Sequence, residues 1–166
     1  MAALPDAEKL CEQLARELKA RVQPSTAMVG IHTGGAWVAE RLHAALALKI
    51  PLGLLDPAFY RDDYAKQGLA KDPKRSKIPF DVEVKDLLLV DDVLHTGRTV
   101  RAAMNELFDY GRPKSISLVV LADRGGRELP IAAQHIGAQV EVPPGKRLRL
   151  KRAANGRLSL EIESAE

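Results

Sequence analysis

The segment Leu87-Leu88-Leu89-Val90-Asp91-Asp92-Val93-Leu94-His95-Thr96-Gly97-Arg98-Thr99 contains most of the information about the fold. The aliphatic run 87–90 predicts a strand that is buried on both faces, and the pattern from Arg98 predicts a helix that ends near Gly111. Two carboxylates therefore follow a strand at its carboxyl end, where open α/β sheets bind ligands. N–H groups at the start of the next helix predict a phosphate site beside them.

A sugar phosphate satisfies both parts of this segment. Ribose hydroxyls donate hydrogen bonds to carboxylates, so Asp91 and Asp92 suit a diol, whereas the loop after them suits a 5′-phosphate. The segment contains neither a Gly-x4-Gly-Lys-Ser/Thr phosphate loop nor a Gly-x-Gly-x-x-Gly dinucleotide turn. An acidic pair after a strand is by itself more often a solvated turn, but Thr96, Gly97 and Thr99 favour a binding site.

The rest of the chain alternates between strand and helix patterns. Strands are expected at 27–31, 51–55, 87–90 and 116–121, and helices at 6–22, 36–48 and 98–110. This order predicts an α/β fold with a largely parallel sheet and helices on both faces, in one domain over 1–166. Between two of these strands, residues 61–81 are rich in charge and poor in apolar side chains, which indicates a functional or disordered loop.

The last part of the chain predicts an antiparallel hairpin at about 146–163. Leu148 and Leu150 alternate with basic residues, and Asn155-Gly156 is typical of a type I′ turn. We expect the basic side chains to form the solvated face of this hairpin, with an RNA or partner surface as the alternative. They are Lys146, Arg147, Arg149, Lys151, Arg152 and Arg157.

Composition indicates an ordinary globular protein. The 166 residues are 46% hydrophobic and 28% charged, and their net charge of +3 suits a phosphate-rich ligand without requiring one. The single cysteine, Cys11, excludes an internal disulfide and is expected to pack in a helix interface. The sequence has no secretory signal pattern and no apolar run of about 18 residues, so we expect a cytoplasmic protein that does not contact a membrane.

Several stretches together resemble one family. Val90 to Thr99, continuing to Ala103, is similar to the signature of type I phosphoribosyltransferases. With 111–113, Asp123 to Pro130 and Tyr60-Arg61-Asp62-Asp63, it resembles the bifunctional pyrimidine-operon regulator and uracil phosphoribosyltransferase family. The resemblance implies a mostly parallel twisted sheet flanked by helices, a small hood that holds the base, and a mobile loop at about 61–81. It also implies a homodimer or higher homo-oligomer.

The resemblance implies a reaction and a set of site residues. The reaction transfers the phosphoribosyl group of 5-phosphoribosyl-1-pyrophosphate (PRPP) to uracil, giving uridine monophosphate (UMP) and pyrophosphate, with Mg2+ bound together with PRPP and no cluster of protein metal ligands. The implied catalytic residues are Asp91, Asp92 and Arg61. The implied PRPP-binding residues are Thr33, Gly34 and Gly35 at the pyrophosphate, and Val93, Leu94, His95, Thr96, Gly97, Arg98 and Thr99 at the 5′-phosphate. The implied base-binding residues are Ala122, Asp123, Arg124 and Gly125.

Three positions depart from the family pattern. Gly34 stands where an arginine is usual, so a cation such as Arg61 would have to compensate. Gly126 and Ala132 stand where the RNA-binding regulators have a histidine and a basic residue, and loss of polar contacts to phosphates weakens RNA binding. The changes at Gly126 and Ala132, together with the retained acidic pair, favour the enzyme over a nucleotide-sensing, RNA-binding attenuator. A purine phosphoribosyltransferase is a further alternative, against which the stretch 123–130 argues.

Overall fold

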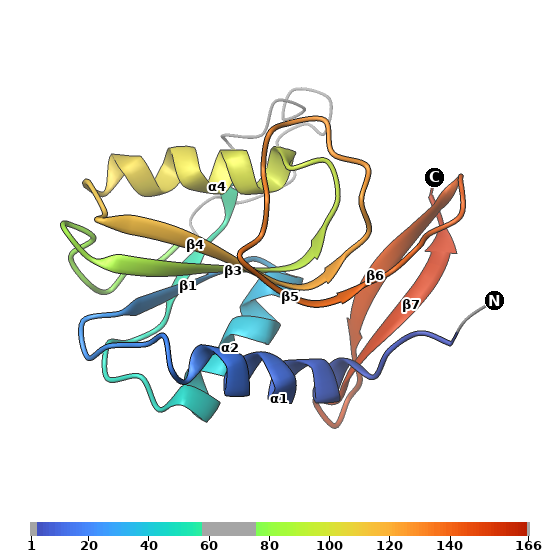
Figure 1. Cartoon of the computed structure of the whole chain (residues 1–166), viewed down its shortest axis with the longest axis horizontal. Helices are drawn as coiled ribbons and strands as arrows, with labels where there is room; N and C mark the ends of the chain where they lie inside the picture. The colour runs from blue at the N-terminus through green and yellow to red at the C-terminus, as the bar shows by residue number, and fades with distance from the viewer. Residues whose placement is uncertain (1–2, 58–75, 166) are drawn as a thin grey trace.

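The core of the protein is a five-stranded parallel sheet (Figure 1). The computed structural model describes residues 3–57 and 76–165. The strand order is β2-β1-β3-β4-β5, and every neighbouring pair is parallel. The strands are β1 (Ala27–Ile31), β2 (Gly53–Leu55), β3 (Asp86–Leu94), β4 (Ser115–Asp123) and β5 (His135–Gln139). The predicted α/β sheet is confirmed.

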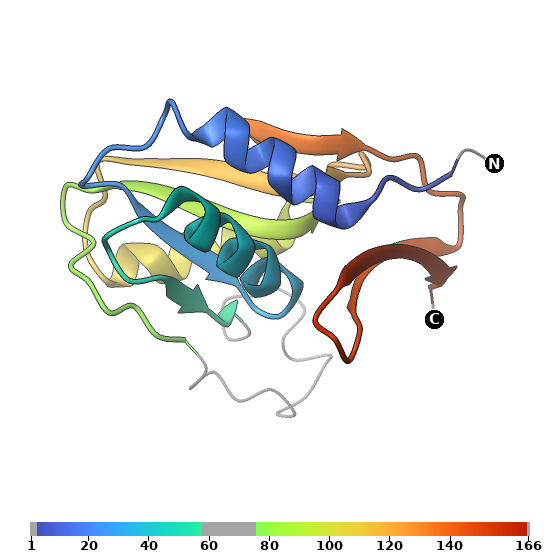
Figure 2. The ribbon, with the colours of Figure 1, turned by 90° about the horizontal axis from the view of Figure 1, so that it is seen from below.

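Helices cover both faces of this sheet (Figure 2). Helices α1 (Ala7–Leu18) and α2 (Gly34–Leu46) lie on one face, and α4 (Arg98–Asp109) lies on the other. Helix α1 begins after Asp6, whose carboxylate accepts hydrogen bonds from two N–H groups of the first turn. None of the helices in the described ranges is long and apolar enough to span a bilayer.

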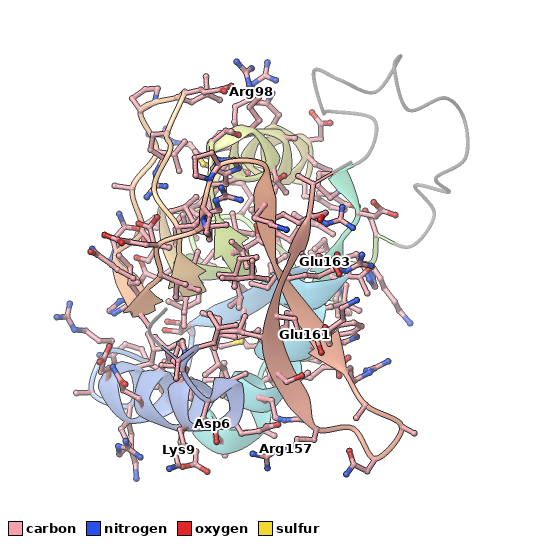
Figure 3. The ribbon with its side chains drawn as sticks, turned by 90° about the vertical axis from the view of Figure 1, so that its right-hand side faces the viewer. Asp6, Lys9, Arg98, Arg157, Glu161 and Glu163 are labelled. Atoms are coloured by element: carbon pink, nitrogen blue, oxygen red, sulfur yellow. The ribbon has the colours of Figure 1, made fainter. Side chains whose placement is uncertain are left out.

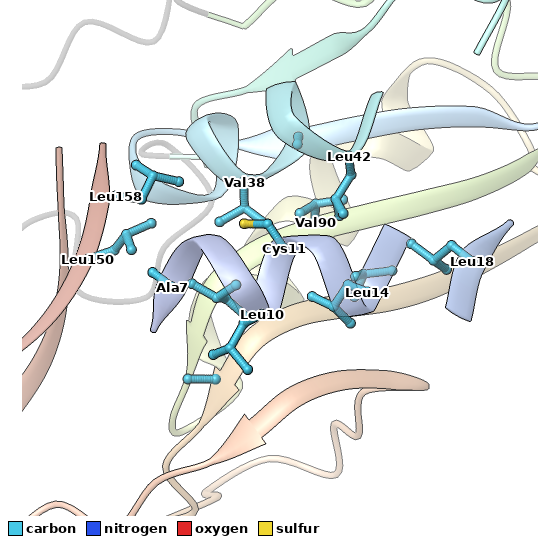
Figure 4. Close-up of a cluster of buried hydrophobic side chains, with 14 of the residues drawn as sticks. Ala7, Leu10, Cys11, Leu14, Leu18, Val38, Leu42, Val90, Leu150 and Leu158 are labelled. Carbon is cyan, nitrogen blue, oxygen red and sulfur yellow. The ribbon is translucent and has the colours of Figure 1, made fainter. Parts of the chain in front are cut away.

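Alternate side chains of the central strand build the two layers of the core. Leu88 and Val90 belong to the cluster beneath α1 and α2, whereas Leu87 and Leu89 belong to the cluster beneath α4. Cys11 is buried in the first of these clusters (Figure 4). Burial raises the pKa of its thiol to about 12, which agrees with the expected packing role.

The chain ends in a hairpin of two antiparallel strands, β6 (Lys146–Arg152) and β7 (Leu158–Ser164). Four leucines of the hairpin, Leu148, Leu150, Leu158 and Leu160, are buried in the same cluster as α1 and α2. The predicted type I′ turn at Asn155-Gly156 is wrong. Such a turn needs positive φ at both central residues, but here Gly156 alone has it, and its N–H donates to the carbonyl of Ala153.

One carboxylate fastens this hairpin to the two helices beneath it. Glu8, in the first turn of α1, accepts hydrogen bonds from Arg41 Nε of α2 at 2.9 Å and from the N–H of Leu158 at 3.0 Å. The same arginine donates to the carbonyl of Gly156 at 2.5 Å. Arg41 also holds the pKa of Glu8 below its usual value, so the carboxylate stays charged at neutral pH.

Two strands differ from the sequence-based prediction. Strand β3 does not end at Val90, since Val93 and Leu94 still pair with β4. Strand β5 was not predicted, because it has no continuous apolar run. At its centre, a Cβ on Gly137 would lie 2.4 Å from the carbonyl oxygen of Leu121, so this strand pairs closely only because the residue is glycine.

Candidate active site

The direction in which strands are added to the sheet reverses between β1 and β3. From β1 the chain moves outward to β2, and it then returns to the other side of β1 and adds β3, β4 and β5 in turn. The carboxyl ends of the strands on either side of such a reversal leave a crevice between the connections that follow them. Here those connections are the turn Thr33-Gly34-Gly35 and the segment after Asp92.

The acidic pair lies inside the last part of β3 rather than in a loop. Asp91 is buried, with 6% of its surface exposed, and its carboxylate accepts a hydrogen bond from the N–H of Asp92 at 2.8 Å. Asp92 is half-buried, and its carboxylate accepts one from the N–H of Val93 at 2.8 Å. The pairing of Val93 with Ala122 continues the strand past both residues, which fixes the direction of their side chains.

The glycine turn brings the start of α2 against this acidic pair. A Cβ on Gly35 would lie 2.6 Å from the carbonyl oxygen of Val90, so only glycine allows this approach. A Cβ on Gly34 would lie 2.1 Å from Oδ2 of Asp92, so this carboxylate occupies the space that any side chain at 34 would need. Thr33 is exposed, and the peptide bond that precedes it is cis.

The predicted phosphate loop shortens to the residues between β3 and α4. Gly97 has a φ of +95°, and it lies against Ile131. Oγ1 of Thr96 accepts a hydrogen bond from the N–H of Arg98 at 3.2 Å, which caps the start of α4. The carbonyl of Thr96 accepts two more from Glu128 and Leu129, at 3.0 and 3.1 Å. The loop is therefore held from outside by the segment that follows β4.

Arg127 holds that segment in place. Its guanidinium donates to both carboxylate oxygens of Asp123, at 2.9 and 2.5 Å, and also to the carbonyls of His95 and Ile131, each at 2.9 Å. The N–H of Gly125 donates to the same carboxylate at 2.9 Å. The Arg127 hydrogen bond is the largest cause of the lowered pKa of Asp123. No pattern in the sequence predicts that one arginine connects the loops after β3 and β4.

The expected base-binding residues differ in their access to solvent. Ala122 is fully buried in β4, and the carboxylate of Asp123 is taken up by Arg127, whereas Arg124 and Gly125 reach the surface. Arg124 lines a pocket of about 700 Å³ with 139–144 of the segment after β5, residues 3–5 and Ile162 of the hairpin. Its Nη1 donates to the carbonyl of Lys146 at 3.2 Å.

The ring of His95 lies close to Gly126, one of the positions that depart from the family pattern. A Cβ on Gly126 would lie 2.9 Å from two atoms of the His95 ring. Partial burial, and after it the nearby charge of Arg124, lower the pKa of His95, so its imidazole is neutral at pH 7. His95 therefore adds no positive charge to the predicted phosphate loop at neutral pH.

A second pocket, of about 320 Å³, lies between the glycine turn and the hairpin. It is lined by Thr33, Gly34, Trp37, Asp92, Arg149, Leu150, Lys151 and Arg152. The hairpin stands in front of this edge of the sheet, with Glu161 and Glu163 on it and Arg157 beside Asp6 (Figure 3). Three of the basic residues that we expected on a solvated face thus border three predicted site residues, Thr33, Gly34 and Asp92. Arg61, the third predicted catalytic residue, lies outside the described residues.

The fold and this arrangement define a class of protein. A family model described as "Phosphoribosyl transferase domain" matches residues 1–143, so the chain belongs to the phosphoribosyltransferase family. The match includes β1 to β5, the glycine turn and the acidic pair, and it ends before the hairpin.

Curated relatives narrow this class. The chain is 46% identical over 152 residues to the "Bifunctional protein PyrR" of Pseudomonas syringae pv. syringae, covering 89% of each chain. It is 52% identical over 126 residues to the protein of the same name from Nitrosococcus oceani, covering 75% of this chain and 71% of the relative. These similarities confirm the resemblance to the pyrimidine-operon regulator family.

Solved structures support the fold independently. A hypoxanthine phosphoribosyltransferase from Staphylococcus aureus superposes with a TM-score of 0.63 at 24% identity, covering 84% of this chain and 74% of the other. A hypoxanthine-guanine phosphoribosyltransferase from Bacillus anthracis reaches a TM-score of 0.66 at 19% identity, covering 88% and 86%. At this identity the likeness shows the fold alone, so it does not decide which base is used.

Proposed function

We propose that the protein is a uracil phosphoribosyltransferase that converts uracil and PRPP to UMP and pyrophosphate. The observation that carries this proposal is the contact between the glycine turn and the acidic pair at the reversal point of the sheet. One ligand that spans this crevice can present a diphosphate to Gly34, ribose hydroxyls to Asp91 and Asp92, and a 5′-phosphate to the loop before α4. PRPP carries these three groups in that arrangement.

The reaction balances with the groups that the chain provides. N1 of uracil forms a bond to C1′ of the ribose, while the C1′–O bond breaks and its electron pair leaves with pyrophosphate. The proton of N1 passes through water to the departing pyrophosphate. Positive charge develops at C1′ during this exchange, and the Asp92 carboxylate stabilises it from the ribose side. The chain holds donor and base in line and stabilises charge, so it needs no nucleophile of its own.

Mg2+ fits this site as a partner of the donor. It prefers oxygen ligands and keeps several waters, and here the carboxylate of Asp92 borders the pocket in which the diphosphate would lie. When it is bound, the ion offsets the negative charge of the leaving group. We assign its other ligands to the oxygens of PRPP and to water.

We choose uracil as the base because the sequence resembles the pyrimidine-operon regulator and uracil phosphoribosyltransferase family, and the similarity to the PyrR proteins supports this choice. We propose that the base lies near Arg124 and Gly125, in the pocket between the segment after β5 and the hairpin. The guanidinium of Arg124 offers hydrogen-bond donors to the edge of a pyrimidine ring.

The test is conversion of radiolabelled uracil to UMP with PRPP and Mg2+, with hypoxanthine and guanine in parallel reactions and Asp92→Asn as the control. We expect turnover with uracil alone and none in the variant. Turnover with a purine would contradict the choice of base. UMP binding without turnover of any base would contradict the enzyme and favour a nucleotide-sensing regulator, to be tested by salt-dependent binding to a pyrimidine-operon leader RNA.

A further inference from the structure

We infer that strand β6 forms the cationic wall of the diphosphate site, with Arg149 and Arg152 binding the diphosphate of the donor. This inference rests on the proposed function, because it names residues for one part of the same ligand. It assigns a binding role to the hairpin, which lies beyond residues 1–143 of the family match.

The pocket beside the glycine turn has two walls from distant parts of the chain. Thr33, Gly34 and Asp92 belong to the ends of β1 and β3, and they face residues 149–152 of β6 across a volume of about 320 Å³. A pocket of this size accommodates a diphosphate with its water and metal ion. Because Gly34 lines it, a ligand that contacts the turn also lies against β6.

Gly34 itself cannot be the place for a cation in this conformation. Any side chain at position 34 starts with a Cβ, and that atom would lie 2.1 Å from Oδ2 and 2.6 Å from Cγ of Asp92. A cationic residue there would displace the carboxylate that faces the ribose. A positive charge for the diphosphate therefore has to come from another element, and β6 is the element across the pocket.

Charges in the pocket favour an anionic ligand. Three basic residues of β6, Arg149, Lys151 and Arg152, line it, against one acidic residue, Asp92. Glu163 of β7 pairs with Arg149 at 3.2 Å and Lys151 at 3.3 Å. Its pKa is lowered to about 2, first by the Arg149 hydrogen bond, so it remains charged at neutral pH and holds these two side chains near the pocket.

Arg152 is held differently from the other two. Its guanidinium lies 4.7 Å from the centre of the Trp37 ring, and Trp37 is in the first turn of α2, directly after the glycine turn. Among the described residues no carboxylate pairs with Arg152, so its N–H groups remain available to an anion. A planar guanidinium presents several donors to phosphate oxygens at once, which makes arginine well suited to this role.

The backbone of β6 is oriented to add to this site. Ala153 donates to the carbonyl of Arg157 and Ala165 donates to that of Gly145, so the odd-numbered residues of β6 form the hydrogen-bonded pairs with β7. The N–H and C=O groups of Leu150 and Arg152 consequently point away from β7, and both residues line the pocket.

The experiment measures binding of three ligands by calorimetry in the presence of Mg2+: pyrophosphate, PRPP and UMP. The variant is Arg149→Gln/Arg152→Gln. The matched control is Arg147→Gln/Arg157→Gln, since Arg147 lies on the same strand, pairs with the same Glu163 and is outside the pocket. We expect the variant to bind pyrophosphate and PRPP at least about tenfold more weakly, because two charge-assisted contacts are lost, and to bind UMP as the wild type does.

Unchanged pyrophosphate binding in the variant, or equal losses in variant and control, would overturn this inference and leave the proposed function intact. An equal loss for UMP would also overturn it, because UMP has no diphosphate and such a loss would show a structural role for the hairpin. If the wild type bound pyrophosphate through these arginines but turned over no base, the proposed function would fail and the anion site would stand.

Discussion

The two connections that meet at the carboxyl edge of the sheet are built in opposite ways. The loop from β3 to α4 is held by polar contacts: Thr96 within the loop, and Arg127 of the segment after β4, which donates to Asp123 and to the carbonyl of His95. The turn from β1 to α2 has almost no side chains, and its glycines press directly against β3. The β3–α4 loop contributes polar groups, whereas the β1–α2 turn brings its backbone close to β3.

This difference shows which groups for binding phosphates each connection can supply and which must come from other elements. A loop that contains hydroxyl groups and leads into a helix N-terminus can bind a phosphate with its own groups. A glycine turn provides backbone N–H groups and space, so the charge that a diphosphate needs must come from a neighbour. In this protein the neighbour is β6, about 115 residues further along the chain.

The largest expected effect comes from a substitution in the acidic pair of β3, which lies beside both connections. Asp92→Asn keeps the size of the side chain and removes its charge, so we expect kcat/KM for uracil to fall by about 10²- to 10³-fold. Asp86→Asn, at the other end of β3, is the control and should leave kcat/KM unchanged. A variant Asp92→Asn with normal steady-state kinetics would show that the carboxylate is not used.

Substitutions at the two neighbouring glycines of the β1–α2 turn distinguish an effect on catalysis from an effect on stability. Gly34→Ala places a Cβ against the mobile end of Asp92, so we expect kcat/KM to fall by about ten- to a hundredfold with little change in the melting temperature. Gly35→Ala meets the backbone of Val90, so it should lower the free energy of unfolding by about 2 kcal/mol or more.

Urea denaturation and steady-state kinetics on both variants check this contrast. A large stability loss in Gly34→Ala, or none in Gly35→Ala, would mean that the turn is not packed as described.

Substitution of Arg127 should weaken the contacts that hold the β3–α4 loop. Arg127→Met leaves the buried Asp123 without its cation, so we expect the free energy of unfolding at pH 7 to fall by about 2 kcal/mol. The pKa of Asp123 is lowered in the folded state, so the stabilisation is present above the unfolded pKa of about 3.9 and is lost as pH falls through the folded value.

Denaturation curves from pH 7 to pH 3 should therefore converge for wild type and Arg127→Met below about pH 4. Arg147→Met, which removes a more exposed cation of the hairpin, is the control and should have a smaller effect at pH 7. A difference that grows toward low pH would contradict the assignment.

The smallest expected effect concerns the layer that supports the glycine turn. Cys11 is buried beneath α2 and the hairpin, and its thiol pKa is raised to about 12. We expect a thiol reagent at pH 8 to label the native protein very slowly and to leave its activity unchanged, with fast labelling in urea. Fast labelling of the native protein would show that this side of the site opens more readily than its packing indicates.

Much of the site was predictable because its signals are local. The aliphatic run before Asp91, the threonines and Gly97 lie within one short segment, and their order predicts strand, loop and helix directly. The strand nevertheless continues to Leu94, because its pairing with β4 outweighs the polar character of Asp91 and Asp92.

The parts that were missed depend on contacts between distant segments. Strand β5 exists because Gly137 lets the backbone approach β4, and no hydrophobic pattern marks it. Arg149 alternates with the buried Leu148 and Leu150, as on a solvated strand face, and Arg152 lies on the opposite face of the strand. The position of both residues beside Gly34 depends on how the whole hairpin docks. Alternation along a strand shows which residues share a face, but it does not show what that face meets.

The anchoring of the hairpin by Glu8 also has a consequence for biosynthesis. The carboxylate of Glu8 in α1 accepts its hydrogen bond from the N–H of Leu158, which is synthesised 150 residues later. The sheet and its acidic pair can form earlier, since their strands end at Gln139. If β6 forms the diphosphate wall, a nascent chain acquires the groups for the ribose and the 5′-phosphate first, and it can bind the diphosphate only after residues 146–152 have been synthesised.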